Sequence, residues 1–246
     1  MKIAVLLKWV PDLVEELEVD DNGTGLDTED LKFKLNEFDD HALEEALLLA
    51  VDGDEVIALA MDGDGGEKML FTALAKGATR GIRLNGSSTE GTAGLAAAFS
   101  QALEAEACDL ILTGVQSVDD RDGQLGPFLA SRMGLPCISV VSAVSLSGQT
   151  ASVNKEYSGG MMAEFEVDLP AVLGIQAARE TPRYAPVSKI RQMQQTSTLE
   201  EFTISTTAAG SGSTVSGFSQ PEGGSGAKMI SDVEELAELL NGLGVV

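Results

Sequence analysis

Unbroken apolar runs that alternate with amphipathic segments constrain the fold of this chain more than any other feature. The runs are short and lack the polar alternation of half-exposed strands, which is typical of parallel strands buried on both faces. The segments between them repeat apolar residues every three or four positions, which predicts helices. We therefore predict an α/β fold, doubly wound, with a mostly parallel sheet. The predicted strands are residues 2–8, 55–61, 81–84, 109–114 and 170–175, and the predicted helices are 40–51, 66–78, 91–107 and 123–134.

A different pattern follows Pro136. Short apolar stretches separated by the turn sequences SGQ and SGG predict a β meander that extends or flanks the parallel sheet. Together, the parallel sheet and the meander predict one α/β domain over residues 1–195.

The C-terminal part of the chain has another composition. Residues 196–228 are rich in Ser, Thr and Gly and cannot bury enough apolar area to fold alone, so we expect an arm. Ser231 and Glu234 have the spacing of a capping box, which predicts a short terminal helix. Residues 196–246 are thus predicted to form an arm and a helix that dock on a partner subunit.

Charge excludes some classes of partner. The chain carries 39 acidic and 16 basic residues, a formal net charge of -23. Nucleic acids and anionic membranes are bound by positively charged surfaces, so neither is expected as a direct partner. No apolar run reaches the roughly 18 residues of a membrane-spanning helix, and the N-terminus does not resemble a signal peptide. Cys108 and Cys137 lie in or beside apolar runs, so we expect buried thiols in a reducing compartment and a cytoplasmic location.

The sequence GVQSVDDRDGQLGP, residues 114–127, stands where a strand gives way to a helix. Open α/β sheets bind ligands outside the carboxyl ends of their strands. Backbone N–H groups of residues 123–126 would lie in the first turn of that helix, where the helix dipole favours a phosphate. Asp119 and Asp120 would then accept hydrogen bonds from ribose hydroxyls or tie the loop together. Carboxylates that cap an empty loop are the alternative.

No catalytic or metal site is expected. The nucleophile motif G-x-S-x-G is absent, and residues 63–66 match neither the dinucleotide fingerprint nor a Walker A loop. His41 is the only histidine, so a serine-histidine triad or a histidine-rich metal site would rest on that one residue. The residues alone predict an acidic nucleotide-binding α/β protein without chemistry of its own.

Five motifs in order along the chain resemble the β subunit of electron transfer flavoproteins, including the FixA-like proteins. They cover about 190 residues, and LPAVLGIQAARETPRYAPVSKI is the most specific, because it is similar to the family's L-P-A-V and N-x-P-R-Y signatures. The motifs are VLLKWVPD (5–12), KLNEFDDHALEEAL (34–47), TALAKGATRGIRL (72–84), GVQSVDDRDGQLGP (114–127) and LPAVLGIQAARETPRYAPVSKI (169–190).

The resemblance implies a subunit that pairs with an α subunit carrying the redox FAD and that itself holds an adenine nucleotide, AMP or a second FAD. QLGP resembles the QVGP of FixA-like and bifurcating proteins, which favours a second FAD. Val115 replaces the Arg of the bifurcating pattern, which favours AMP. Both nucleotides therefore remain candidates, and AMP is preferred. In this resemblance Gly126 keeps the start of the helix open, and Asn36 either contacts the nucleotide or caps its own helix. The implied nucleotide contacts are Leu6, Asn36, Met61, Ser117, Asp120, Gly123, Gln124, Leu125 and Gly126.

The segment after Tyr184 resembles the family's recognition loop, by which the β subunit docks dehydrogenases. Val187 stands at the position of the family's Leu, but the usual lysine-rich tail is RQMQQ here, which implies partners of different charge. The resemblance thus implies electron transfer from flavin dehydrogenases to an acceptor oxidoreductase, and a stand-alone adenine-nucleotide sensor is the alternative. The expected docking residues are Pro182, Arg183, Tyr184, Val187 and Arg191.

Overall fold

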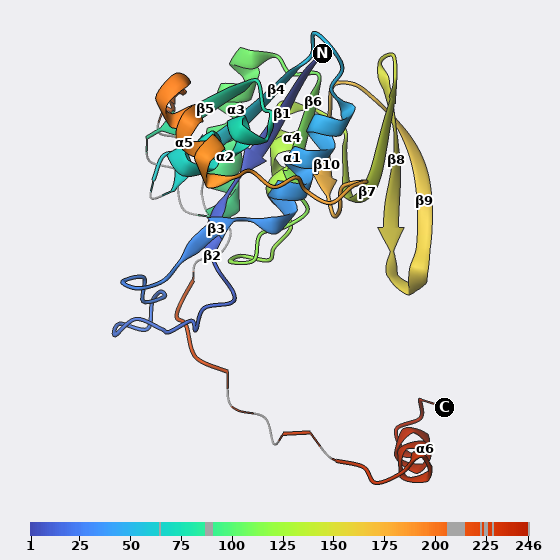
Figure 1. The fold of residues 1–246 in the computed structure, drawn as a ribbon. Coiled ribbons are helices and arrows are strands. Elements are labelled where there is room, and N and C mark those ends of the chain that lie inside the picture. Colours follow the sequence, from blue (N-terminus) through green and yellow to red (C-terminus); the bar gives the residue numbers. More distant parts are fainter. Residues whose placement is uncertain are drawn as a thin grey trace. The chain divides into compact units, whose positions relative to one another are not determined.

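The computed structural model describes residues 1–63, 65–86, 91–205, 215–221, 223, 226–227 and 229–245 (Figure 1). The chain divides into two compact units: Met1–Leu17 with Thr28–Val215, and Glu18–Asp27 with Ser216–Val246. Much of the expected Ser/Thr/Gly-rich arm, namely residues 206–214, 222, 224–225 and 228, lies outside the described residues.

The first unit is built on a sheet with the strand order β11-β5-β4-β1-β6-β10-β7-β8-β9 (Figure 1). Neighbouring strands from β11 to β7 run parallel, and β7, β8 and β9 form an antiparallel meander. The predicted mostly parallel sheet with a flanking meander is therefore confirmed. The strands are β1 (Lys2–Leu7), β4 (Glu55–Met61), β5 (Arg80–Asn85), β6 (Leu110–Gly114), β7 (Cys137–Ser147), β8 (Thr150–Tyr157), β9 (Met161–Asp168), β10 (Ala171–Ile175) and β11 (Glu200–Thr203).

Helices cover both faces of this sheet, as doubly wound folds require. α1 (Glu37–Leu49) and α2 (Gly66–Lys76) pack on one face, whereas α3 (Gly91–Glu106) and α4 (Leu125–Met133) pack on the other. β1 contributes to both layers, because Val5 faces the first pair of helices and Leu6 the second. Both side chains are at most 2% exposed, and burying each stabilises the fold by about 1.5–3 kcal/mol.

The remaining elements of the first unit are short. β2 (Trp9–Pro11) and β3 (Phe33–Leu35) form a separate antiparallel pair. A single 3-10 turn, Ser158–Gly160, joins β8 to β9, and α5 (Val187–Thr196) packs on α2.

β11 extends the sheet beyond residue 195, where the sequence analysis placed the end of the α/β domain. It pairs with β5 through backbone hydrogen bonds and ion pairs. Arg80 Nη2 lies 2.6 Å from Glu200 Oε2, and Arg83 pairs with Glu201 in the same way. Residues 200–203 therefore belong to the sheet, and the first compact unit reaches Val215.

In the second unit, α6 (Val233–Gly242) is the expected terminal helix. Its N-cap is Asp232, whose side chain accepts a hydrogen bond from the N–H of Glu235 at 2.9 Å. The carboxylate of Glu235 in turn accepts the N–H of Ser231. The predicted capping box of Ser231 with Glu234 is therefore wrong by one residue, because aspartate caps a helix as well as serine does.

The two cysteines differ in burial. Cys108 is buried, and burial raises the pKa of its thiol to about 11. Cys137, at the first residue of β7, is only partly buried, so the expectation of two buried thiols is correct for Cys108 alone. Among the described helices, none is long and apolar enough to cross a membrane.

Candidate functional site

A cavity of about 270 Å³ opens at the carboxyl ends of the central strands. The chain adds β4 and β5 on one side of β1 and then returns to add β6 and β10 on the other. Such a reversal of strand order is where open α/β sheets bind ligands. The wall is largely apolar and includes Leu6, Trp9, Phe33, Met61, Phe99 and Leu125.

A smaller cavity of about 20 Å³ adjoins the first, and we call it the polar end because most residues around it have polar or charged side chains. Both cavities are lined by Lys8, Asp39, Leu95 and Leu125, so they are two ends of one crevice. The polar end is also lined by four of the residues that the sequence analysis singled out: Ser117, Asp120, Gly123 and Gln124.

Lys8 follows β1 directly and binds two aspartates of the acidic loop. Its Nζ lies 2.7 Å from Asp120 Oδ2, 2.9 Å from Asp119 Oδ1 and 2.9 Å from Ser117 Oγ. Burial alone would lower the pKa of Lys8, but the hydrogen bonds to the two aspartates outweigh it and raise the pKa. Both aspartates therefore bind a side chain of the protein itself, and they join the loop to the end of β1.

Asp122 closes the same loop. Its Oδ1 accepts the N–H of Gln124 at 3.0 Å, and its other carboxylate oxygen accepts the hydroxyl of Thr92. The expectation of free N–H groups throughout residues 123–126 is therefore wrong for Gln124, because an Asx turn occupies that donor. Within the described chain, the N–H groups of Gly123, Leu125 and Gly126 have no acceptor.

Asp39 joins the ends of two central strands. Its carboxylate accepts the N–H of Lys8 at 2.9 Å and the N–H of Gly114 at 3.0 Å. Residue 114 must be glycine, since a side chain there would clash with Asp39. The residue is 5% exposed, and burial raises the pKa of Asp39 to about 7 despite these hydrogen bonds.

Asn36 precedes α1 and is fully buried. Its side chain does not cap the helix, which decides against the capping alternative. Instead, Nδ2 donates to the carbonyl of Gln116 at 2.9 Å and holds the loop. Among the described residues, Asn36 Oδ1 and Thr113 Oγ1 are buried without a hydrogen-bond partner, and neither residue lines the two cavities.

Lys8 and Trp9, at the end of the first predicted strand, were expected at the crevice but were given no role, whereas Asp39 was not expected there. Lys8 and Trp9 directly follow β1, and their place at a strand's carboxyl end was the available signal. Asp39 lies in the first turn of α1, three residues after Asn36, and nothing in its local sequence predicts that its carboxylate turns inward.

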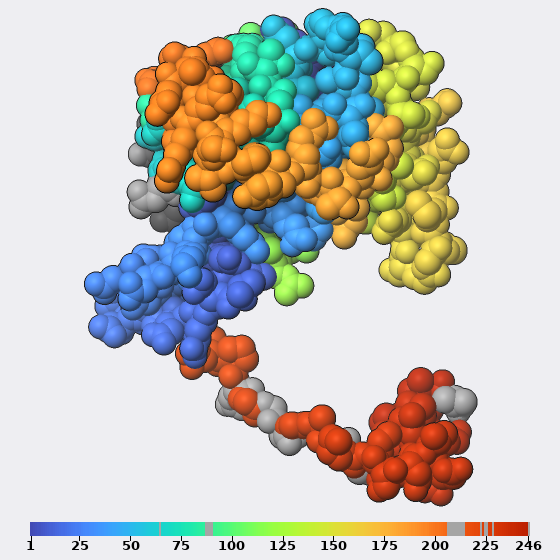
Figure 2. All heavy atoms as spheres, viewed as in Figure 1, coloured from blue at the N-terminus to red at the C-terminus, as the bar shows by residue number. Residues whose placement is uncertain are grey.

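The expected docking residues lie together on residues 178–191, which we call the docking segment. Tyr184 and Val187 are 80% and 57% exposed, whereas Ala185 between them is buried. Arg183 is tied to Glu44 by an ion pair of 2.7 Å. Pro182 and Arg191 lie at the surface of the same segment, which is orange in Figure 2.

The fold and the crevice define a doubly wound α/β protein with a ligand-sized site at its topological switch point. The chain belongs to the electron transfer flavoprotein β subunit family, because the model of the electron transfer flavoprotein domain matches residues 24–206 and its relatives are β subunits. Its role is accordingly that of an electron transfer flavoprotein subunit.

Individual relatives agree with this assignment. The chain is 33% identical to the electron transfer flavoprotein subunit beta of Methylophilus methylotrophus over 211 residues, 83% of this chain and 80% of the relative. It is 34% identical to the mitochondrial subunit beta of Arabidopsis thaliana over 194 residues, 77% of each chain. The subunit beta of Bradyrhizobium diazoefficiens is 28% identical over the full length of both chains.

Proposed function

We propose that this β subunit pairs with an α subunit carrying FAD and binds AMP in the crevice. The heterodimer would accept electrons from flavin dehydrogenases and pass them to an acceptor oxidoreductase in the cytoplasm. The AMP would be a scaffold that fixes the loops of the crevice and would take no part in the electron transfer.

The observation that carries this proposal is the two-part crevice. An apolar end of about 270 Å³ suits one purine ring, and it lies just below the roughly 300–1,000 Å³ of pockets that enclose drug-sized ligands. The polar end presents backbone N–H groups at the start of α4, where a phosphate is favoured. A cavity of this size suits a mononucleotide such as AMP.

The site residues take separate roles in this proposal. Leu6, Met61 and Leu125 would contact the base, and the unpaired oxygen of Asn36 would accept a hydrogen bond. Ser117 and Asp120 would keep Lys8 beside the phosphate. Gly123 and Leu125 would donate their N–H groups, while Gly126 leaves room next to Thr113 and Gln124 completes the turn.

The docking segment supports the second half of the proposal. Apolar side chains as exposed as those of Tyr184 and Val187 favour contact with a partner protein. We propose that these residues, with Pro182, Arg183 and Arg191, contact the dehydrogenases. Residues beyond the sheet, with α6, would dock on the α subunit.

Counting cofactors tests the proposal. The chain should be co-purified with its α subunit, and the FAD and AMP released per heterodimer should be measured. One FAD and one AMP would support a simple carrier, whereas two FAD and no AMP would indicate the bifurcating type. A stable nucleotide-bound monomer that ignores the α subunit would refute the proposal and favour a nucleotide sensor.

A further inference from the structure

One face of α1 supplies the hydrogen-bond acceptors that the start of the docking segment needs. Residues 176–186 form neither helix nor strand, so their backbone groups must find partners elsewhere. His41 Nδ1 accepts the N–H of Ala178 at 3.2 Å. Glu45 accepts the N–H of Arg179 at 3.0 Å, and Glu44 accepts that of Arg183 at 2.9 Å.

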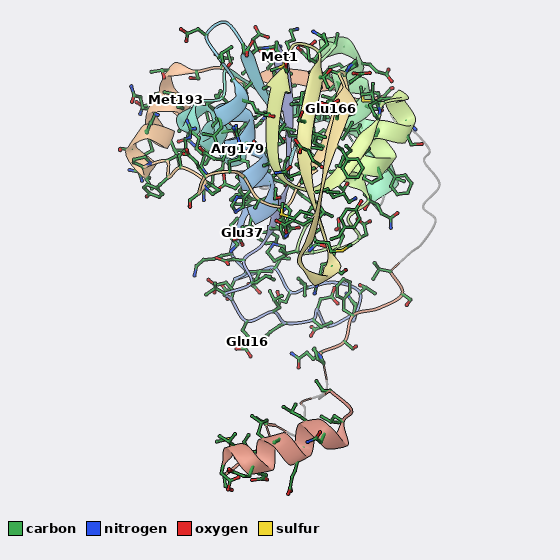
Figure 3. The ribbon with its side chains drawn as sticks, turned by 90° about the vertical axis from the view of Figure 1, so that its right-hand side faces the viewer. Met1, Glu16, Glu37, Glu166, Arg179 and Met193 are labelled. Carbon is green, nitrogen blue, oxygen red and sulfur yellow. The ribbon has the colours of Figure 1, made fainter. Side chains whose placement is uncertain are left out.

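These three acceptors lie on the same side of the helix because residues three and four positions apart are neighbours. Figure 3 labels Arg179 beside the ribbon of α1, and in Figure 2 the orange segment crosses the blue surface of that helix. The segment therefore has one helix face as its support.

The same two glutamates also bind the arginine side chains. Arg183 Nη2 lies 2.7 Å from Glu44 Oε1, and its Nε lies 2.9 Å from Glu44 Oε2, which is a two-pronged ion pair. Arg179 Nε lies 2.7 Å from Glu45 Oε1. Glu44 is 3% exposed and Glu45 is fully buried. Burial would raise the pKa of Glu44, but the hydrogen bonds from Arg183 outweigh it and lower the pKa, so the carboxylate stays charged.

A second element holds Arg183 in place. Its Nη1 approaches the carbonyl of Lys76, at the end of α2, at 3.5 Å. The guanidinium is thus fixed between α1 and α2, directly before the exposed Tyr184.

We propose that Glu44 and Glu45 are positioning residues that hold the docking segment in the shape that partner dehydrogenases recognise. They act through Arg183 and Arg179 and touch no partner themselves. Fixing the segment before binding lowers the entropy cost of docking, so Tyr184 and Val187 meet the partner in their bound arrangement. This inference rests on the proposed function, because it requires the docking segment to contact dehydrogenases.

The experiment uses the full heterodimer and a flavin dehydrogenase that reduces the wild-type protein. The variants are Glu44→Gln and Glu45→Gln, with Glu106→Gln as matched control, because Glu106 also pairs with an arginine, Arg80, but lies away from the docking segment. We expect KM for the heterodimer to rise about tenfold in the first two variants with kcat unchanged, and no change of KM in the control. A general loss of stability would affect the control as well.

Two further variants separate the possible failures. If Glu44→Gln prevents assembly, Arg183→Lys keeps the charge and removes the two-pronged geometry, and an unchanged KM in that variant overturns the inference. The double variant Glu44→Gln, Arg183→Lys should raise KM no more than the single variant with the larger effect does, because the two residues act as one unit. If Val187→Ala raises KM but neither glutamate variant does, the positioning role is wrong, while the proposal that the docking segment contacts dehydrogenases remains supported. If Val187→Ala also leaves KM unchanged, the proposed docking role itself fails.

Discussion

The ammonium group of Lys8 lies 2.7 Å from a carboxylate oxygen of Asp120. This ion pair would allow an acidic loop to border the proposed phosphate site. The hydrogen bond to Lys8 outweighs burial and lowers the pKa of Asp120, so both charges persist and largely cancel. Lys8 thus offsets part of the negative charge of the loop, and in the proposed complex the N–H groups of Gly123 and Leu125 would bind the phosphate.

Replacing Lys8 should therefore release the nucleotide. In Lys8→Gln, Asp119 and Asp120 lose their cation and repel the phosphate, so the AMP retained per heterodimer should fall at least about tenfold, which corresponds to ~1.4 kcal/mol. AMP released on denaturation measures this. Lys32→Gln is the control, because Lys32 forms a surface ion pair with Glu15 and should leave the AMP content unchanged. Full AMP content in Lys8→Gln would contradict the assignment of the polar end.

A glycine exchange tests the phosphate turn. Gly123 has a φ of +63°, and a Cβ there would lie 3.3 Å from the carbonyl oxygen of Val115. Gly123→Ala should cost about 1–2 kcal/mol of strain and shift the N–H groups that face the phosphate. We expect weaker AMP binding by calorimetry.

Gly134→Ala is the matched control for that exchange. Gly134 caps the other end of α4 with a φ of +68°, and a Cβ there would meet no atom within 4 Å. Gly134→Ala should lower the free energy of unfolding about as much as Gly123→Ala does and should leave the affinity for AMP unchanged. If the two variants bound AMP with equal affinity, the phosphate would not lie at this turn.

Asp39 should make stability depend on pH. Its folded-state pKa of about 7 lies above the value of ~3.9 in unfolded chains, so the folded state binds the extra proton between these values. The free energy of unfolding should fall by about 3 kcal/mol as the pH rises from 4 to 7. In Asp39→Asn this contribution disappears, so the difference between variant and wild type should change across that range in urea titrations. Parallel pH curves for the two proteins would show that Asp39 does not titrate there.

Apolar residues of α6 should matter for assembly. Val233 and Leu236 are 75% and 39% exposed and lie three residues apart, on one side of the helix. If the helix docks on the α subunit, Val233→Ser with Leu236→Ser should weaken the heterodimer about tenfold or more in analytical ultracentrifugation. Glu234→Gln, on the same helix, should have little effect. If the double exchange left the heterodimer affinity unchanged, α6 would not be part of the interface.

Local patterns predicted the fold well and the polar contacts poorly. The continuous apolar run of β1 predicts a strand buried on both faces, and the structure has it. The contact between Asp39 and Gly114 joins residues 75 positions apart, so no local pattern contains it. The same holds for Glu45 and Arg179, which are 134 positions apart. Apolar burial follows from periodicity, whereas the partner of a buried charge depends on how distant elements meet.

Completion of the sheet also bears on biosynthesis. The ion pair between Arg80 on β5 and Glu200 on β11 spans 120 positions. A ribosome must therefore finish most of the chain before the outer edge of β5 can be covered. Until then β5 presents unpaired backbone groups, the feature through which nascent chains pair with one another and aggregate. The synthesis of residues 200–203 therefore closes an edge of the sheet that is open in every shorter nascent chain.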